Sequence, residues 1–156
     1  MKQLFIVRHA KASNDSLEDF DRPLNEQGIN DAQLIAEKLK LLNKTIDCVI
    51  CSSAKRTRST FKILNAAINA SKASYNDLLY HGTEQDYFEL IKSTNDSINT
   101  LMIVGHNPSV TALVNNLSSA SIFDMATSSV AIINFDNNKW SNLSNKGCNL
   151  EDYIKT

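Results

Sequence analysis

The run Gln3-Leu4-Phe5-Ile6-Val7, which is followed at once by Arg8 and His9, decides the fold of this chain. Two similar runs come later, at Asp47-Cys48-Val49-Ile50-Cys51 and at Thr100-Leu101-Met102-Ile103-Val104. Short, uninterrupted apolar runs are typical of strands that are buried on both faces of a parallel sheet. The sequence therefore predicts three central parallel strands.

Helical patterns separate these runs. Apolar residues recur every three or four positions over 29–42, 54–68 and 110–117. Alternating strands and helices predict α/β layering. Near the end, residues 130–135, a polar turn and residues 140–143 predict an antiparallel hairpin at a sheet edge. The predicted fold is one domain over residues 1–156, a three-layer α/β/α sandwich with a mostly parallel sheet.

Capping residues mark the expected helix starts. Asn25 precedes the first helix, Ser52 or Ser53 the second, and Thr83 opens an acidic variant of the capping box. Asn107 stands at the expected cap of a further helix, with Pro108 at its first position. The segment 10–24 has little periodicity and many charges, so it is predicted to be a long loop, which in a small domain is more often functional than not.

Composition excludes several classes of protein. The chain has 156 residues, the size of one domain, and 16 Lys and Arg against 17 Asp and Glu, so it lacks the positive field of a non-specific nucleic-acid binder. Its 4 glycines cannot form a dinucleotide or P-loop motif. The first apolar run is too short for a secretory or membrane segment. We expect a cytoplasmic protein with no membrane or nucleic-acid partner.

The 3 cysteines, Cys48, Cys51 and Cys148, are an odd number, and two of them lie inside an apolar run. Disulfides are therefore not expected. No second pair of Cys or His stands nearby to complete a zinc site, so no metal is expected.

Phosphate-binding residue types follow the predicted strands, where open α/β sheets bind their ligands. The first strand is followed by Arg8 and His9, the second by Ser52 and Arg56, and the third by His106. Guanidinium groups pair with phosphate oxygens, and imidazole is a nucleophile that is largely neutral near pH 7. Together these side chains predict a site for phosphoryl groups.

Three motifs carry a resemblance to a known family. The stretches 4–10 (LFIVRHA), 52–60 (SSAKRTRST) and 104–108 (VGHNP) resemble, in this order and spacing, the motifs of the histidine phosphatase superfamily, whose fold is that of phosphoglycerate mutase. Similarity extends from residue 2 to about residue 143, and the segment 21–28 looks most like the SixA branch of phosphohistidine phosphatases. One departure is Ala10, where the superfamily more often has glycine. Alanine fits there if its backbone keeps a negative φ.

The resemblance implies a metal-independent phosphatase without a cofactor. His9 would attack phosphorus and carry a phosphohistidine intermediate. The phosphoryl oxygens would be held by Arg8, Arg56 and His106. The candidate substrate-binding residues are Arg22, Ser52 and Asn107, although Arg22 is as well explained by surface pairing with Asp19 or Asp21.

The general acid is the least marked part of the predicted site. Asp77, His81 and Glu84 are weak candidates, because each has an ordinary explanation as a turn or helix-start residue. An alkoxide leaving group needs a proton, whereas a phosphorylated imidazole can leave as neutral imidazole once its second nitrogen is protonated. The expected substrate is therefore phosphohistidine in a protein, such as a histidine-containing phosphotransfer domain.

Two alternatives stay open from the sequence. The first is a phosphatase for a small phosphorylated substrate, a phosphoramidate, pyrophosphate or phosphomonoester. The second is a phosphate-recognising module without turnover, against which the presence of His9 argues. The chain is expected to act as a monomer.

Overall fold

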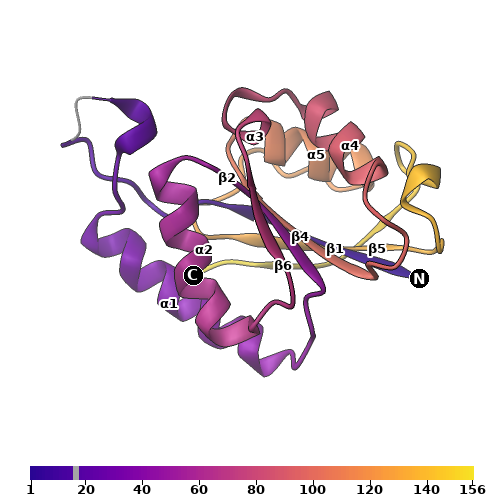
Figure 1. Ribbon diagram of the computed structural model, residues 1–156, viewed down its shortest axis with the longest axis horizontal. Coiled ribbons are helices and arrows are strands. Elements are labelled where there is room, and N and C mark those ends of the chain that lie inside the picture. The colour runs from indigo at the N-terminus through magenta and orange to yellow at the C-terminus, as the bar shows by residue number, and fades with distance from the viewer. Residues whose placement is uncertain (16–17) are drawn as a thin grey trace.

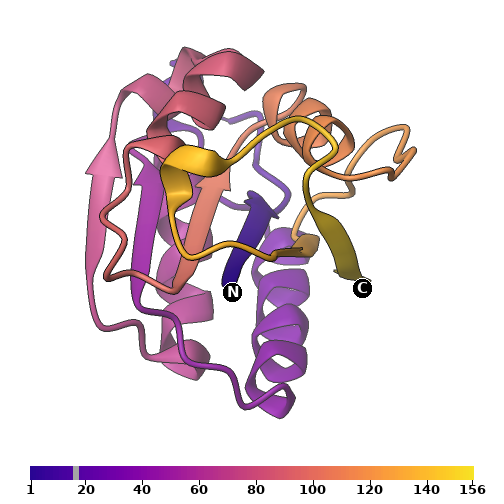
Figure 2. The same ribbon diagram turned by 90° about the vertical axis from the view of Figure 1, so that its right-hand side faces the viewer.

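The computed structural model describes residues 1–15 and 18–156, and a six-stranded sheet forms its middle layer. The strands are β1 (Lys2–Arg8), β2 (Cys48–Ser52), β3 (Ala73–Asn76), β4 (Thr100–Gly105), β5 (Val130–Phe135) and β6 (Asn149–Ile154). Their order is β3-β2-β4-β1-β5-β6, which Figure 2 shows from left to right. The first four strands are parallel, and β5 and β6 are antiparallel to their neighbours.

Helices cover both faces of this sheet. They are α1 (Glu26–Leu41), α2 (Lys55–Ile68), α3 (Leu78–His81), α4 (Glu84–Lys92) and α5 (Ser109–Leu117), with two short 3-10 helices, η1 (Asp19–Asp21) and η2 (Trp140–Asn142). Helices α1 and α2 lie on one face, and α3, α4 and α5 lie on the other (Figure 1). The predicted three-layer α/β/α fold is confirmed. No helix in the described ranges is long and apolar enough to cross a membrane.

The two-residue period of the strands divides the core into two halves. In β1, Leu4 and Ile6 pack on the side of α4 and α5, whereas Phe5 and Val7 pack on the side of α1 and α2. Strand β4 alternates in the same way. Because each face of these strands is covered, neither set of side chains needs to be polar, which explains the uninterrupted apolar runs.

The antiparallel edge differs from the prediction in its second strand. Residues 140–142 form η2 instead of a strand, and β5 pairs with β6. The Trp140 side chain is fully buried, and its indole N–H donates to the carbonyl of Ile98 at 2.8 Å. The chain therefore coils at Trp140, which buries the indole, and the strand that pairs with β5 begins only at Asn149.

Two of the predicted helix caps are confirmed. The Asn25 side chain accepts a hydrogen bond from the Gly28 N–H at the start of α1. At the start of α4, Thr83 and Asp86 form the reciprocal capping box. These starts were correctly predicted because a cap depends on residues only a few positions apart.

The other two predicted caps are wrong. Helix α2 follows Ala54 without a side-chain cap, so neither Ser52 nor Ser53 is its N-cap. Helix α5 begins after Pro108, which leaves Asn107 outside the helix. The side chains of Ser52 and Asn107 instead bond to other segments at the candidate active site.

The loop after β1 returns to the start of α1. Ala12 and Leu24 form an isolated antiparallel bridge, and the Asn25 N–H donates to the Lys11 carbonyl at 3.0 Å. A Cβ at Gly28 would lie 2.1 Å from the Lys11 carbonyl oxygen, so this close approach requires glycine. Both ends of the loop are thus fixed against α1, and η1 lies in the loop between them.

Candidate active site

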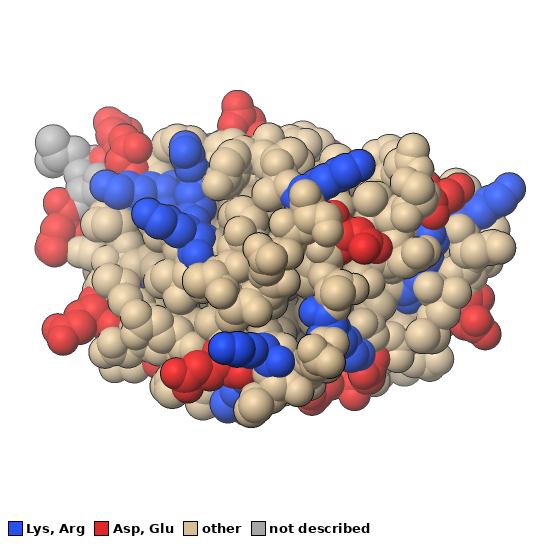
Figure 3. Space-filling view, turned by 60° about the horizontal axis from the view of Figure 1, so that its bottom comes forward, with Lys and Arg blue, Asp and Glu red and all other residues tan. Residues whose placement is uncertain are grey.

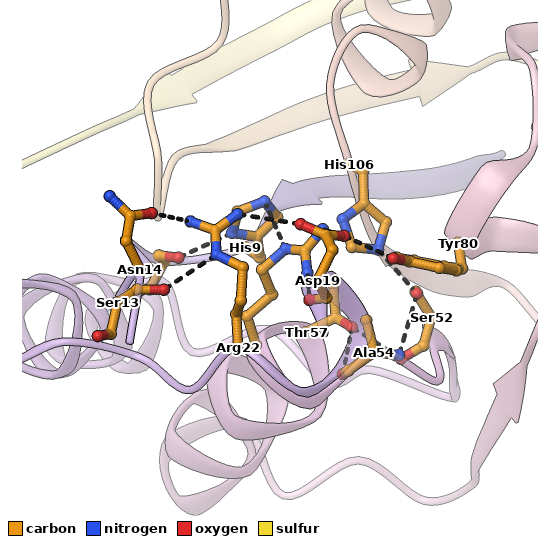
Figure 4. Close-up of polar contacts among 12 residues, drawn as sticks. His9, Ser13, Asn14, Asp19, Arg22, Ser52, Ala54, Thr57, Tyr80 and His106 are labelled. Carbon is orange, nitrogen blue, oxygen red and sulfur yellow. Dashed lines mark hydrogen bonds and ion pairs between the residues drawn. The ribbon is translucent and has the colours of Figure 1, made fainter. Parts of the chain in front are cut away.

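The strand order brings the predicted site residues together at the carboxyl edge of the sheet. Strands β2, β4 and β1 are neighbours in the sheet. Strand β2 ends at Ser52, β4 ends just before His106, and β1 ends just before His9. The imidazole rings of His9 and His106 lie 5.1 Å apart between centroids, and the Arg56 Nε–H points at His9 Nε2 across 3.4 Å (Figure 4).

A backbone contact orients His9. Its Nδ1 lies 2.7 Å from the carbonyl oxygen of Ala10, and Ala10 keeps a negative φ. Because a carbonyl only accepts hydrogen bonds, Nδ1 carries the ring hydrogen and Nε2 keeps its lone pair. Burial, helped by the charges of Arg56 and Arg8, lowers the pKa of His9 to about 4. His9 is therefore a neutral imidazole near pH 7, with Nε2 facing Arg56.

His106 is buried beside it. Its Nε2 lies 2.8 Å from the Ser52 Oγ, and its backbone N–H donates to the Tyr87 hydroxyl at 3.2 Å. Its Nδ1 is buried and has no hydrogen-bond partner among the described residues. Burial lowers the pKa of His106 to about 3, with smaller effects of His9 and Arg56 in the same direction. His106 is thus a second neutral imidazole at this edge.

Asp19, which lies in η1, forms ion pairs with two arginines, Arg22 and Arg56. Arg56 donates to the Asp19 backbone carbonyl at 2.8 Å and to its Oδ2 at 3.2 Å, while Arg22 donates to Oδ1 at 3.1 Å. The Tyr80 hydroxyl donates to Oδ2 at 2.5 Å. This hydrogen bond from Tyr80, helped by those of Arg22 and Arg56, lowers the pKa of Asp19 to about 2. Asp19 is therefore ionised at neutral pH.

The structure is compatible with both interpretations of Arg22, as a substrate-binding residue and as a partner of Asp19. Arg22 pairs with Asp19, and it also lies close enough to His9 for its charge to lower the pKa of that ring. Its Nε donates to the Ser13 carbonyl at 2.9 Å, which fixes the guanidinium across the loop (Figure 4).

Arg8 and Asn107 meet at the segment 124–125. The Arg8 Nη1 donates to the Asp124 carboxylate at 3.4 Å and to the Met125 carbonyl, and the Asn107 amide donates to the same two residues. The Arg8 Nε is buried without a partner in the described part of the chain. The Asn107 side-chain oxygen accepts from Thr111 at 2.7 Å. Arg8 thus keeps its buried Nε–H unpaired, whereas both polar atoms of the Asn107 side chain bond within the protein.

Of the three weak candidates for a general acid, His81 lies beside an aromatic residue of the site. Its ring lies 4.0 Å from that of Tyr80, whose own ring is 5.6 Å from His106. Asp77 and Glu84 stand at the starts of α3 and α4. Sequence reasoning missed the hydrogen bond between Tyr80 and Asp19, because the two residues are 61 positions apart and no motif links them.

The charge of the site is mostly positive. Three guanidinium groups, those of Arg8, Arg22 and Arg56, surround His9, and two carboxylates pair with them, Asp124 with Arg8 and Asp19 with the other two. Residues 1–15 and 18–156 contain no group of three or more His, Cys, Asp or Glu that could hold a metal ion. Forked cations around a neutral imidazole suit a tetrahedral dianion such as a phosphoryl group.

Comparisons with known proteins point in the same direction. Residues 4–79 match the family model of the histidine phosphatase superfamily, branch 1. An uncharacterised protein of Mycobacterium tuberculosis H37Rv is 37% identical over 121 residues, which cover 77% of this chain and 75% of that protein. The phosphohistidine phosphatase SixA of Escherichia coli K12 is 27% identical over 157 residues, covering 96% of each chain.

Solved structures agree on the fold. The structure of the protein histidine phosphatase SixA complexed with tungstate superposes with a TM-score of 0.84 at 25% identity, covering 98% of this chain and 96% of that one. The glucosyl-3-phosphoglycerate phosphatase of mycobacteria superposes with a TM-score of 0.70 at 13% identity, which is a likeness of fold alone.

Proposed function

Because the chain belongs to the histidine phosphatase superfamily, in its SixA-type group, we propose that it hydrolyses phosphohistidine on proteins through a covalent intermediate on His9. The observation that carries this proposal is the orientation of His9, whose Nδ1 contacts the Ala10 carbonyl while Nε2 faces Arg56. In this proposal no metal takes part, because the arginines supply the positive charge that phosphoryl transfer needs.

The hydrogen bond from His9 to Ala10 serves both steps of the proposed reaction. In the first step, the Nε2 lone pair attacks phosphorus, the bond from phosphorus to the substrate nitrogen breaks, and that nitrogen keeps the electron pair. Since Nδ1 already holds its hydrogen, no proton has to leave His9 when Nε2 is phosphorylated. In the second step, water attacks phosphorus, and His9 leaves as the same neutral tautomer with the water proton on the released phosphate.

The phosphoryl oxygens have donors on several sides in this proposal. As these donors we assign the Nε–H of Arg56, the unpaired Nε–H of Arg8 and the unpaired Nδ1 of His106. Such preorganised donors stabilise the charge that spreads over the oxygens in the transition state. Arg22 adds positive charge from the loop, and we assign Ser52 and Asn107 to the support of His106 and of segment 124–125.

The charge state of Asp19 supports phosphohistidine over an alkyl phosphate as the substrate. Asp19 is the carboxylate bonded to Arg56, and with a pKa of about 2 it holds no proton to give to a leaving alkoxide at neutral pH. A phosphorylated imidazole does not need that proton from the enzyme when its second nitrogen is already protonated.

A labelling experiment tests the covalent step. Incubation with a radiolabelled phosphoramidate should place an acid-labile, alkali-stable phosphate on the protein, and chelators should not change the yield. His9→Asn should abolish the label, while His81→Asn, which removes another histidine near the site, should retain it. Equal labelling of His9→Asn and the unmodified protein would contradict the proposed nucleophile.

A comparison of substrates tests the leaving group. A phosphotransfer domain phosphorylated on histidine should be hydrolysed at least about a hundredfold faster, by kcat/KM, than an alkyl phosphate such as glycerol phosphate, since general acid catalysis is worth about 10²- to 10⁴-fold. Similar kcat/KM values for the two substrates would show that the site has a proton donor and would overturn the assignment to phosphohistidine.

A further inference from the structure

A groove runs along the exposed side of α2, directly beside the candidate active site. Its volume is about 560 Å3, and three cations of α2, Lys55, Arg58 and Lys62, line it together with Phe20 and Tyr75. All three cations are exposed, and none of them forms an ion pair within residues 1–15 and 18–156. Figure 3 shows Lys and Arg side chains gathered at the left of the molecule, where α2 begins in Figure 1.

The position of two of these cations is unfavourable for the helix itself. Lys55 and Arg58 stand in the first turn of α2, which contains no acidic residue. The N-terminus of a helix carries partial positive charge, so carboxylates stabilise it and cations do not. A sequence that breaks such a local rule commonly does so for function. Lys55 and Arg58 are therefore better explained by a ligand than by the stability of the helix.

The spacing of the cations indicates an extended ligand. Lys55, Arg58 and Lys62 follow one another at three and four residues, so they line one side of α2 over about 10 Å. They do not converge on one point, as donors to a single phosphate would. A partner helix with Asp or Glu at the same three- and four-residue spacing would place a carboxylate near each cation. Charge complementarity thus favours an acidic helix over a small anion.

Aromatic side chains provide apolar contacts in the same groove. Tyr75 is about half exposed, and the Arg58 guanidinium lies 4.8 Å from the centre of its ring. Phe20 is 38% exposed and contacts the Tyr80 ring edge to face, with 5.0 Å between centroids. Tyr, Phe and Arg are enriched in surfaces that bind proteins. The only acidic residue that lines the groove, in the described part of the chain, is Asp21.

Two residues that line the groove are chain neighbours of site residues. Phe20 follows Asp19, which bonds to Arg56, and Lys55 precedes Arg56 at the start of α2. We propose that this α2 groove binds an acidic helix of the phosphorylated protein substrate while its phosphohistidine reaches His9. This inference rests on the proposed function, and it adds to it the chemistry of the partner and the surface that recognises it.

A binding experiment tests the groove without requiring catalysis. Binding of a fluorescent oligoglutamate peptide to the unmodified protein should weaken as salt is added. The double variant R58E/K62E should bind it at least about tenfold more weakly, because charge reversal replaces attraction by repulsion. K38E/K40E, which makes the same net charge change on exposed positions of α1, should bind as the unmodified protein does. Equal weakening by both double variants would overturn the assignment to this groove.

A kinetic experiment tests the role of the α2 groove in binding the protein substrate. With a phosphotransfer domain that is phosphorylated on histidine and carries carboxylates along the same helix, R58E/K62E should raise KM at least about tenfold with little change in kcat. With free phosphohistidine, kcat/KM should change less than about twofold, since both substituted residues lie outside the site. Equal losses on the two substrates, or no loss on either, would overturn the docking role.

The two proposals fail in different ways. If the unmodified protein hydrolyses neither substrate, the proposed function is wrong, and the peptide experiment still decides whether the groove binds an acidic peptide. If both substrates are hydrolysed but the peptide does not bind, the groove assignment alone is wrong.

Discussion

The protonation of His9 links the site to the stability of the fold. Its pKa falls from 6.5 to about 4 on folding, so the unfolded chain binds the proton more tightly. The contribution of His9 to the free energy of unfolding is therefore fully present above about pH 6.5 and is lost as the pH falls towards 4. The shift corresponds to about 3 kcal/mol for His9. His106, whose pKa is lowered to about 3, acts in the same direction.

We accordingly expect the free energy of unfolding to depend less on pH in the His9→Asn variant. Urea titrations at pH 7 and pH 4.5 measure this, with His81→Asn as the control because it removes an exposed histidine. An identical loss of stability in His9→Asn and the unmodified protein would show that His9 does not resist protonation in the folded state.

We expect Ser52 to control the tautomer of His106. Its Oγ accepts a hydrogen bond from the Ala54 N–H at 3.4 Å and lies 2.8 Å from His106 Nε2. We expect the hydroxyl hydrogen to point at Nε2, which leaves the ring hydrogen on the unpaired Nδ1, where it can reach a phosphoryl oxygen.

Ser52→Ala should therefore lower kcat/KM about tenfold, less than the loss of a direct oxyanion donor would. Nitrogen NMR shifts of His106 should show a change of tautomer in the same variant, which a purely structural role would not produce. Ser53→Ala is the matched control. An unchanged tautomer in Ser52→Ala would contradict this role.

At the scale of elements, the Tyr87 hydroxyl joins three of them. It donates to the carbonyl of Leu79 in α3 at 2.7 Å and accepts from the His106 N–H that follows β4. Gly105 makes room for it, since a Cβ there would lie 2.3 Å from the hydroxyl oxygen. Helix α4 thus helps to place His106 through a hydrogen bond to its backbone.

Tyr87→Phe should leave the Leu79 carbonyl and the His106 N–H buried and unpaired, which costs about 1–3 kcal/mol. Urea unfolding measures the loss of stability. The control is Tyr75→Phe on the exposed edge strand, which should change stability by less than about 0.5 kcal/mol. If Tyr87→Phe lowered the free energy of unfolding as little as this control does, the Tyr87 hydroxyl would not hold these elements together.

At the scale of the whole molecule, the buried Trp140 and the site lie at opposite ends of the central strands. Trp140 is fully buried, and its partners Ile98 and Asp96 precede β4. The indole also lies beside Lys2 at the start of β1. The site residues follow the other ends of these two strands. Stability and function can therefore be changed separately.

Trp140→Ala should destabilise the protein by about 3–5 kcal/mol, because a large buried side chain is removed. Activity per folded molecule, measured well below the unfolding temperature, should change less than about twofold. Phe123→Ala, at a fully exposed position, should alter neither property. A large loss of activity in folded Trp140→Ala would show that the two ends are coupled.

The sequence alone determined those features that depend on residues close together in the chain. Uninterrupted apolar runs identified the parallel strands, and capping at Asn25 and Thr83 identified two helix starts. The residues that end the central strands predicted the candidate site, because parallel strands present their carboxyl ends at one edge.

Tertiary structure decided the features that depend on distant contacts. Trp140 leaves the predicted hairpin because its indole is buried against Ile98, 42 positions away. Asp19 joins the site through Arg56 and Tyr80, which are 37 and 61 positions away. No local pattern encodes such pairs, because their free energy arises only when packing has already brought the segments together.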